Sequence, residues 1–438
     1  MESFFSPKTI ALIGASNKKG KIGNDIFNNL KVSKSKIIPV NINKEKIMGQ
    51  KSYEKVSDYS GKIDLAIIVI PAKFVLEVLK ECGEKKIKSA IIISAGFGEV
   101  GNKELEAQVF DLCKNYNIKL LGPNCLGILN INNNLNASFY KGRILKGGIS
   151  FVSQSGAIGV SVLDKSASEN IGFSKFISVG NMLNTDFSDC IKYLSKDKDT
   201  KVICLYIEGI KDGESFIKAV KSCKKPIITL KAGFTITAMK AISSHTGSLA
   251  GNSRIYDSIF RQFGIIKVNN LSEMFNLAKY LSNNPMPKSR NVCIITNAGG
   301  MGVLCSDACE SNGLTVAKLP DAVEKEISTF LPNHWNKSNP IDILGDALAD
   351  RYALALKTLS GKKFYDILLV ILTPQSNTEV EKSMKALINF KAKNHSIAIF
   401  SCFVGGEKID KALKLANRHN IINFDEPYFF AKSVSKLF

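Results

Sequence analysis

The stretch Thr9-Ile10-Ala11-Leu12-Ile13-Gly14-Ala15-Ser16 begins with residues that favour a buried β-strand and ends in a turn of small residues. Gly20 and Gly23 follow it, and apolar residues then recur at helical spacing from Ile26 to Leu30. A strand, a glycine turn and a helix in this order are typical of a nucleotide-binding α/β unit, in which the helix N-terminus can hold a phosphate group. We therefore expect a doubly wound α/β fold.

The same pattern continues to about residue 128. Four further apolar runs predict strands at 36–40, 64–70, 90–94 and 118–121. The later runs end in small or turn-forming residues, namely Pro71-Ala72, Ala95-Gly96-Phe97-Gly98 and Gly122-Pro123-Asn124. Because ligands of open α/β sheets bind beyond the carboxyl ends of the strands, we expect a ligand site at these turns.

The first glycine turn does not match the dinucleotide fingerprint GxGxxG, because Ala15 and Ser16 interrupt it. The second strand ends in Asn41-Ile42-Asn43 and not in the Asp or Glu that holds a ribose diol. These two features argue against NAD and therefore against an NAD-dependent oxidoreductase. A Rossmann-like domain without any ligand stays open at this point.

A second α/β block runs from about residue 145 to about residue 283. Apolar runs predict its strands at 149–152, 173–178, 202–207 and 226–230. The first of these strands ends at Ser153-Gln154-Ser155-Gly156, and a helix is expected to begin at Ala157. A hydroxyl-rich turn at a helix N-terminus offers free N–H groups and the positive end of the helix dipole, which together indicate an anion site.

The segment Ser243-Ser244-His245-Thr246-Gly247-Ser248-Leu249-Ala250-Gly251 carries one of only 4 histidines in 438 residues. Hydroxyl residues and glycines allow a backbone to approach a phosphate group and to donate N–H groups to it. A neutral imidazole in such a loop can attack phosphorus, so His245 is a candidate nucleophile. Taken alone, the segment is equally compatible with a polar surface turn that contains an incidental histidine.

Glu208 follows the predicted strand 202–207 and therefore lies at the same edge of the sheet as Ser153 and Lys231. A carboxylate at this position could accept the N–H of His245. That contact would fix the tautomer, leave the other ring nitrogen free to attack, and stabilise the cation formed on phosphorylation. The alternative for Glu208 is a solvated charge at the end of a strand.

The polar segment Asn283–Lys288, which contains two prolines, predicts a linker to a third block. Strands are expected at 291–296, 367–372 and 396–401, and the first of them ends at Asn297-Ala298-Gly299-Gly300. The turn Asn339-Pro340-Ile341-Asp342 could face this glycine-rich edge. No strong nucleophile stands there, because His334 and His419 are expected to pack or to face solvent.

Composition narrows the possible functions. The net charge is +20, yet the lysines are spread along the chain without an arginine-rich run, which argues against a nucleic-acid-binding protein. The longest apolar runs, such as 65–70, are too short to span a membrane, and the N-terminus lacks the pattern of a secretory signal. None of the 10 cysteines forms a CxxC pair, so we expect no metal site and a reducing, cytoplasmic compartment.

The order of these motifs resembles the family of NDP-forming acyl-CoA synthetases, relatives of succinyl-CoA synthetase, and within it the alpha subunit of ADP-forming acetyl-CoA synthetase. The motifs that carry the resemblance are Ile13–Ser16, Ser94–Glu99, Gly122–Gly127, Ser153–Gly156, Ser178–Asn181, Ile207–Gly209, Leu230–Gly233, Ser243–Gly251, Thr296–Gly300 and Asn339–Asp342. They span nearly the whole chain. The resemblance implies an α/β protein with an N-terminal Rossmann-like CoA-binding domain at 1–130, followed by two flavodoxin-like, succinyl-CoA synthetase-like doubly wound domains at 145–283 and 290–438.

The resemblance also implies roles for individual residues. Coenzyme A would be bound by the turns of the first domain, at Gly14, Ala15, Ser16, Gly20, Gly23, Asn41, Pro71, Ser94, Ala95, Gly96 and Asn124. The transferring phosphate would be bound at Ser153, Gln154, Ser155, Gly156, Ala157, Thr246 and Gly247. His245 would become a phosphohistidine, and Glu208 would orient it. No metal ligand is implied in this chain.

The implied activity is that of a ligase that interconverts acyl-CoA, ADP and phosphate with free acid, CoA and ATP, through an acyl phosphate and a phosphohistidine. The sequence contains no P-loop, and nothing in it resembles an ATP-grasp domain. ADP or ATP with Mg²⁺ would therefore bind to a separate ATP-grasp beta subunit, in an α2β2 heterotetramer. The alternative is a non-catalytic CoA-binding regulatory protein of the same fold, which would lack the pair of His245 and Glu208.

Overall fold

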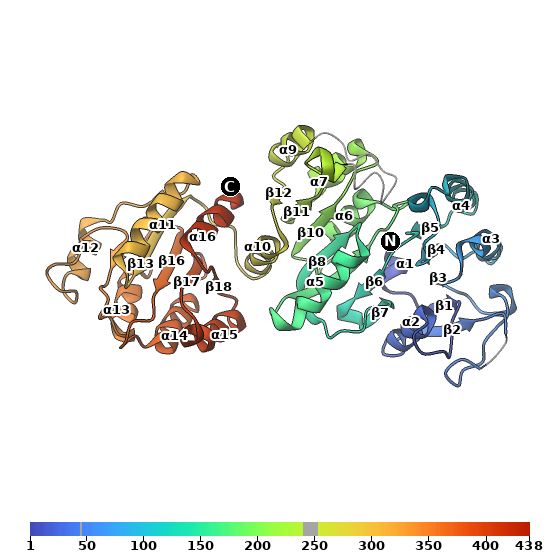
Figure 1. Ribbon diagram of the computed structural model, residues 1–438, viewed down its shortest axis with the longest axis horizontal. Coiled ribbons are helices and arrows are strands. Elements are labelled where there is room, and N and C mark those ends of the chain that lie inside the picture. The colour runs from blue at the N-terminus through green and yellow to red at the C-terminus, as the bar shows by residue number, and fades with distance from the viewer. Residues whose placement is uncertain (44–45, 240–252) are drawn as a thin grey trace. The chain divides into compact units, whose positions relative to one another are not determined.

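The computed structural model describes residues 1–43, 46–239 and 253–438. The chain divides into two compact units, Met1–Met274 and Phe275–Phe438, and each unit is described here by itself (Figure 1). In the ranges described, no helix has the length and apolar character needed to cross a membrane. The expected α/β fold class is confirmed, because parallel strands alternate with helices in both units.

The first sheet of the first unit is parallel, with the strand order β2-β1-β3-β4-β5. Its strands are β1 (Thr9–Ile13), β2 (Lys36–Val40), β3 (Leu65–Ile68), β4 (Ser89–Ile92) and β5 (Lys119–Leu121). Its helices are α1 (Glu2–Phe5), α2 (Ile22–Leu30), α3 (Val75–Glu84) and α4 (Lys103–Asn115), with short 3₁₀ turns at Val56–Asp58, Ala72–Phe74 and Gly98–Val100. The strand predicted over Thr9–Ile13 is therefore confirmed.

Helices cover both faces of this sheet. Along β1, Ile10 and Leu12 belong to a core that includes residues of α1 and α2. Ala11 and Ile13 belong to a second core with residues of α3 and α4. Alternate residues of a strand point to opposite faces, so a strand buried on both faces reads as a continuous apolar run rather than as an alternating pattern.

The second sheet of the first unit has the order β12-β11-β10-β8-β9-β6-β7. Its strands are β6 (Gly127–Asn130), β7 (Leu135–Ser138), β8 (Leu145–Ser153), β9 (Gly172–Ser178), β10 (Val202–Ile207), β11 (Ile227–Lys231) and β12 (Ile266–Val268). Its helices are α5 (Gly156–Ser168), α6 (Phe187–Lys196), α7 (Gly213–Ser222) and α9 (Ser253–Gln262), and α10 (Leu271–Asn283) follows them. The two sheets share one apolar core, in which Leu12 of β1 and Val152 of β8 both take part.

Residues 127–138 form a structure that the sequence reading did not predict. They make an antiparallel hairpin, β6 and β7, whose first strand pairs antiparallel with β9 of the second sheet. Two positions in the left-handed region make the tight path possible. Asn134 closes the turn at φ 54°, and Gly127 at φ 107° leaves no room for a Cβ beside the Ala137 carbonyl.

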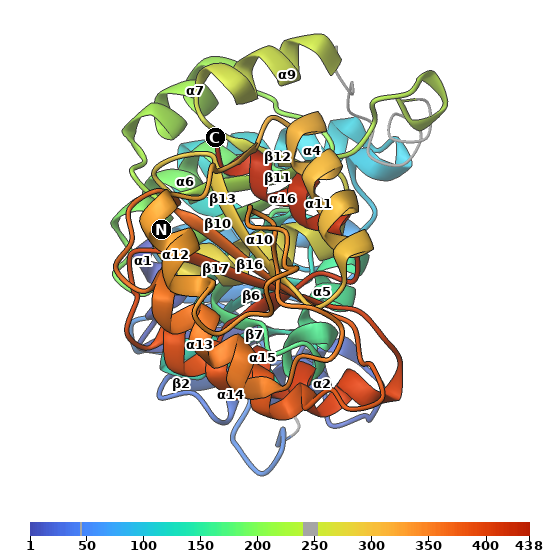
Figure 2. The same ribbon diagram turned by 90° about the vertical axis from the view of Figure 1, so that its left-hand side faces the viewer.

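The second unit contains a third parallel sheet of order β14-β13-β16-β17-β18, with β15 beside β13. Its strands are β13 (Asn291–Thr296), β14 (Thr315–Val316), β15 (Ile341–Asp342), β16 (Ile367–Leu372), β17 (Ala398–Phe403) and β18 (Ile422–Asn423). Its helices are α11 (Gly299–Ser311), α12 (Asp321–Ile327), α13 (Ala349–Leu359), α14 (Val380–Lys391), α15 (Asp410–Arg418) and α16 (Pro427–Val434). α11 and α16 cover one face, and α12 to α15 cover the other (Figures 1 and 2).

The boundary between the two units lies inside α10 and precedes the predicted linker at 283–288. The Tyr280 hydroxyl donates a hydrogen bond to the Pro285 carbonyl at 2.7 Å, and the Tyr280 ring packs on Phe400. These contacts attach the end of α10 and the residues after it to the second unit.

Candidate active site

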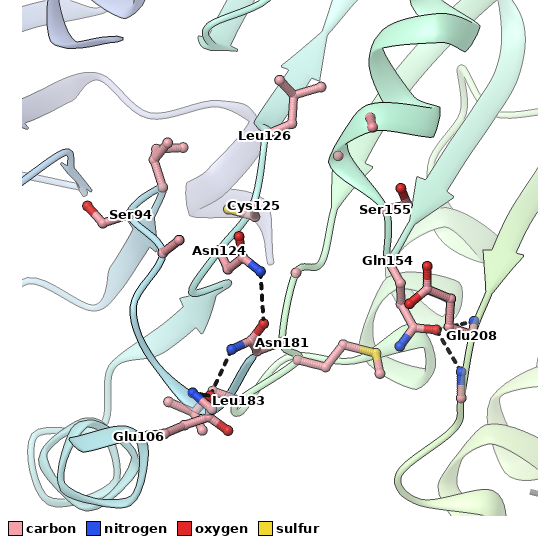
Figure 3. Close-up of a pocket in the computed structure, with 18 of the residues that line it drawn as sticks. Ser94, Glu106, Asn124, Cys125, Leu126, Gln154, Ser155, Asn181, Leu183 and Glu208 are labelled. Atoms are coloured by element: carbon pink, nitrogen blue, oxygen red, sulfur yellow. Dashed lines mark hydrogen bonds between the residues drawn. The ribbon is translucent and has the colours of Figure 1, made fainter. Parts of the chain in front are cut away.

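A cavity of about 1080 Å³ lies in the first unit, where turns of both sheets face one another. Eight of the residues proposed from the sequence line it, namely Ser94, Ala95, Asn124, Gln154, Ser155, Gly156, Ala157 and Glu208. Figure 3 shows two facing walls of this cavity. One wall carries Ser94 and Asn124, which follow strands of the first sheet, and the other carries Gln154 and Glu208, which follow strands of the second.

The second wall includes the N-terminus of α5, a helix of 13 residues. Ser155 caps it, because its Oγ accepts the N–H of Ile158 at 3.3 Å. Gly156 and Ala157 form the first turn and line the cavity, so unsatisfied N–H groups and the positive end of the helix dipole lie at this wall. This arrangement suits a phosphate group, as the turn Ser153–Gly156 predicts.

Ser153 has a different position from its neighbours. It is fully buried, and its hydroxyl accepts the N–H of Ser155 at 3.1 Å and donates to the Ser155 carbonyl at 2.8 Å. The Ser153 side chain therefore shapes the turn, and the structure does not bring it to the cavity.

Gln154 connects the α5 turn to Glu208. Its Oε1 accepts the backbone N–H groups of Glu208 at 2.5 Å and of Gly209 at 3.0 Å (Figure 3). Because Oε1 is engaged with that turn, Nε2 is the amide atom that Gln154 can offer to a ligand. Nε2 is a donor, and a donor at this wall is compatible with an anion.

Glu208 is 6% exposed and lines the cavity at the carboxyl end of β10. Its carboxylate forms a hydrogen bond with the hydroxyl of Tyr206, and burial together with this carboxylate raises the pKa of Tyr206 to about 12. The solvated strand end that the sequence allowed is thereby excluded. Glu208 is a buried carboxylate held at a defined place in the cavity wall.

The first wall is built by the turn after β5. Gly180 sits so close to this turn that an added Cβ would lie 2.1 Å from the Pro123 carbonyl oxygen. The backbone N–H of Asn181 donates to the same carbonyl at 3.0 Å. Asn124 adopts the left-handed conformation at φ 57°, which Asn tolerates better than most residues. The turn therefore rests on the segment that follows β9.

Sequence reasoning assigned no role to Asn181, Glu99 or Glu106, which form a polar network at this wall, or to Lys211, which also lines the cavity. Asn181 Nδ2 donates to Glu99 Oε2 at 2.6 Å. It also donates to Glu106 Oε2 at 2.8 Å, while Asn181 Oδ1 accepts from Asn124 Nδ2 at 3.4 Å (Figure 3). Glu99 and Asn181 end two of the motifs seen in the sequence. Their partnership could not be found there, because it joins residues 82 positions apart.

Two pKa values in this network are shifted. Burial alone would raise the pKa of Glu99, but hydrogen bonds from the Asn181 side chain and from the Gly96 and Phe97 N–H groups outweigh it and lower that pKa. Partial desolvation lowers the pKa of Lys211, against the opposing charges of Glu106 and Asp186. Lys211 and Glu106 both line the cavity, so its lining contains both signs of charge.

The remaining residues proposed for coenzyme A do not line the cavity, namely Gly14, Ala15, Ser16, Gly20, Gly23, Asn41, Pro71 and Gly96. They lie at the carboxyl edge of the first sheet, which is also the edge of Ser94. Asn41 holds the glycine turn, because its Nδ2 donates to the Ala15 carbonyl at 2.7 Å. A Cβ on Gly23 would lie 2.0 Å from the Gly14 carbonyl, so Gly23 allows α2 to approach the turn closely.

His245, Thr246 and Gly247 lie outside the described residues. His334, His395 and His419 are exposed, and for His334 and His419 this is one of the two outcomes, packing or facing solvent, that the sequence left open. The predicted meeting of Asn339–Asp342 with the glycine edge of the third sheet is confirmed, because Asp342 pairs with Thr296. Within the portions of the chain that the structure describes, no group of His, Cys, Asp and Glu could hold a metal ion.

Three family profiles match consecutive parts of the chain. The CoA binding domain matches residues 8–131, the succinyl-CoA ligase like flavodoxin domain matches residues 146–281, and the ligase-CoA domain matches residues 292–437. Among solved structures, the dinucleotide forming acetyl-coenzyme A synthetase 1 of Ca. Korarchaeum cryptofilum, in complex with phosphate and ADP, superposes with a TM-score of 0.95 at 36% identity. That match covers 100% of this chain and 96% of the other.

Curated relatives agree with these matches. Subunit alpha of acetate–CoA ligase [ADP-forming] II from Pyrococcus furiosus is 41% identical over 435 residues, which is 98% of this chain and 95% of that subunit. Acetate–CoA ligase [ADP-forming] from Methanocaldococcus jannaschii is 43% identical over 437 residues, and there the chain spans 62% of the relative's length. The expectation drawn from the sequence motifs is thus confirmed, and the chain belongs to the family of ADP-forming acetate–CoA ligases.

Proposed function

We propose that this chain is the catalytic alpha subunit of an ADP-forming acyl-CoA ligase that interconverts acyl-CoA, ADP and phosphate with the free acid, CoA and ATP. The observation that carries the proposal is the cavity wall in which a helix N-terminus, Gln154 and a buried Glu208 lie together. It is supported by the alpha-subunit relatives from Pyrococcus furiosus, which the chain covers almost completely.

Coenzyme A is proposed to bind along the carboxyl edge of the first sheet. Its phosphates would meet the turn around Gly14–Ser16 and the exposed Gly20, and its thiol would reach the cavity beside Ser94 and Asn124. The three-domain division at 1–130, 145–283 and 290–438 belongs to this proposal, with the first domain as the CoA-binding part. The match to the CoA binding domain over residues 8–131 supports it.

The first chemical step is attack on the thioester. A phosphate oxygen bonds to the acyl carbon, the carbon–sulfur bond breaks, and the sulfur leaves as a thiolate that takes up a proton to give CoA. The N-terminal N–H groups of α5 and Gln154 Nε2 hold the phosphate oxygens and offset their charge as it redistributes. The wall of Asn124 and Asn181 holds the acyl end of the substrate.

The second step moves the phosphoryl group to His245. An imidazole nitrogen bonds to phosphorus, the bond between phosphorus and the acyl oxygen breaks, and the free carboxylate leaves. Glu208 accepts the other ring N–H, which keeps the attacking nitrogen unprotonated and stabilises the cation that forms. The phosphohistidine then passes its phosphoryl group to ADP. This last step is proposed to occur on a separate ATP-grasp beta subunit that binds ADP with Mg²⁺, in an α2β2 assembly.

The test uses the chain alone with acetyl-CoA and phosphate. We expect release of CoA, followed by formation of a stable phosphorylated protein. The amount of CoA released and the amount of phosphoryl group bound should not exceed the amount of protein. A non-catalytic CoA-binding protein would bind acetyl-CoA and release nothing. Binding of CoA without any release of CoA or any phosphorylation would therefore overturn the proposal in favour of that alternative.

A further inference from the structure

Lys231, the last residue of β11, is a buried cation that the proposed mechanism does not use. It is 4% exposed, and its Nζ donates to the Glu208 carbonyl at 2.9 Å and to the Ala232 carbonyl. The same Nζ lies 4.7 Å from the centre of the Tyr256 ring and 5.6 Å from that of Phe234. Two carbonyls and two ring faces therefore surround the ammonium group.

This environment argues against a role for Lys231 as a nucleophile or as a phosphate ligand. Its N–H groups point at carbonyls, and Lys231 does not line the cavity. Burial of an ammonium group is costly, so its contacts must offset the loss of water. Burial also lowers the pKa of Lys231 to about 8, against the opposing effect of the Glu208 carboxylate.

The turn after β10 depends on side chains from three other elements. The N–H groups of Glu208 and Gly209 bond to Gln154 at the α5 turn, and the Glu208 carbonyl bonds to Lys231 on β11. The N–H of Ile210 donates to the Tyr256 hydroxyl, on α9, at 3.2 Å. Beyond the end of a strand these backbone groups lack strand partners, so the three side chains fix the direction in which Glu208 points.

Two of those side chains come from opposite sides of residues 240–252. Lys231 precedes that segment in the chain and Tyr256 follows it, and the two meet through the contact between ammonium group and ring. The chain on both sides of the segment is thus attached to the turn that carries Glu208. A shift of the Glu208 carboxylate by about an ångström is enough to slow a step that depends on its alignment.

We propose that Lys231 is a positioning residue that, together with Tyr256, keeps the Glu208 carboxylate aligned for phosphoryl transfer. This inference rests on the proposed function, in which Glu208 orients the phosphorylated histidine. It assigns Lys231 no contact with phosphate or with the acyl group. Loss of Lys231 must therefore slow phosphorylation and leave CoA binding unchanged.

The experiment measures single-turnover phosphorylation of the full chain by acetyl phosphate, and CoA affinity by calorimetry, for Lys231→Met, Tyr256→Phe and a control. The control is Lys175→Met, which removes another buried cation of the same sheet. Lys175 is 2% exposed and pairs with Asp197 at 2.7 Å, away from the cavity lining. Both variants lose a buried ammonium group, but only Lys231→Met removes a contact with the turn that carries Glu208. A difference between their phosphorylation rate constants therefore reports on the position of Glu208.

We expect Lys231→Met to lower the phosphorylation rate constant roughly 10-fold or more, with CoA affinity as in the wild type. Tyr256→Phe, which removes one hydroxyl, should lower the rate constant less but in the same direction. A wild-type rate in Lys231→Met, or a loss no greater than in Lys175→Met, would overturn the inference. If Lys231→Met does not fold, a wild-type rate in Tyr256→Phe overturns it. A wild-type protein that takes no phosphoryl group from acetyl phosphate contradicts the proposed function itself.

Discussion

Glu208 is held by its backbone and presents its carboxylate to the cavity, so a change confined to that carboxylate should affect chemistry and not folding. We predict that Glu208→Gln slows phosphorylation roughly 10²-fold or more, the usual scale for a lost acid–base partner. Glu214→Gln is the matched control, because Glu214 is exposed and forms a surface ion pair with Lys218 on α7. Rapid acid quench after mixing with acetyl phosphate gives both rates. Equal rates in the wild type and Glu208→Gln would contradict the assignment.

Glu99 leads to a prediction about pH. Its pKa in the folded chain is lower than the ordinary glutamate value of 4.5, so its ionised form contributes stability above pH 4.5 and that contribution is lost as the pH falls through the lowered pKa. The difference in unfolding free energy between the wild type and Glu99→Gln should therefore be constant above pH 4.5 and shrink below it. Urea unfolding at a series of pH values on both sides of 4.5 measures it. A difference in unfolding free energy that grows as the pH falls would contradict a lowered pKa for Glu99.

At the scale of elements, the N-terminus of α5 is the feature to test. Gly156 opens this helix, and an added Cβ would meet nothing closer than Leu126 at 3.8 Å, so the fold tolerates alanine there. The methyl group would stand in the cavity where phosphate is expected. We predict that Gly156→Ala raises the KM for phosphate roughly 10-fold, because misplacement of a reacting group by an ångström has effects of this order. Gly213→Ala is the control, since Gly213 begins α7 with open space around it. An unchanged KM for phosphate in Gly156→Ala would show that phosphate does not bind at the N-terminus of α5.

The elements also show what could be predicted from the sequence. Strands such as Thr9–Ile13, Asn291–Thr296 and Ile367–Leu372 were found because burial on both faces makes them continuous apolar runs. The hairpin at 127–138 was missed, since its pairing with β9 depends on a partner that lies far along the chain. In the same way, the local pattern of Ser153–Gly156 was enough to predict a candidate anion site, whereas the bond of Gln154 to Glu208 could not be predicted because the two residues are far apart in the chain. Local patterns predict strands and turns, but long-range side-chain contacts appear only in the folded chain.

At the scale of the whole molecule, the chain is expected to need a partner to make ATP. The relatives named as alpha subunits have nearly its length, whereas it spans 62% of the Methanocaldococcus jannaschii relative. We predict that the purified chain, supplied with acetyl-CoA, phosphate, Mg²⁺ and ADP, makes no ATP beyond a trace, and that addition of an ATP-grasp beta subunit starts turnover. A luciferase assay measures the product. Sustained ATP production without a second polypeptide would reveal a nucleotide site within this chain.

The proposed mechanism depends most directly on the identity of the phosphorylated residue. The measurement is to incubate the chain with acetyl-CoA and labelled phosphate, to quench it, and to map the label by peptide mass spectrometry under basic conditions. The proposed mechanism predicts an acid-labile, base-stable phosphoryl group on His245 and none on His334, His395 or His419, which are exposed and are not among the residues that line the cavity. A label on any other residue, or CoA release without a labelled protein, would contradict it.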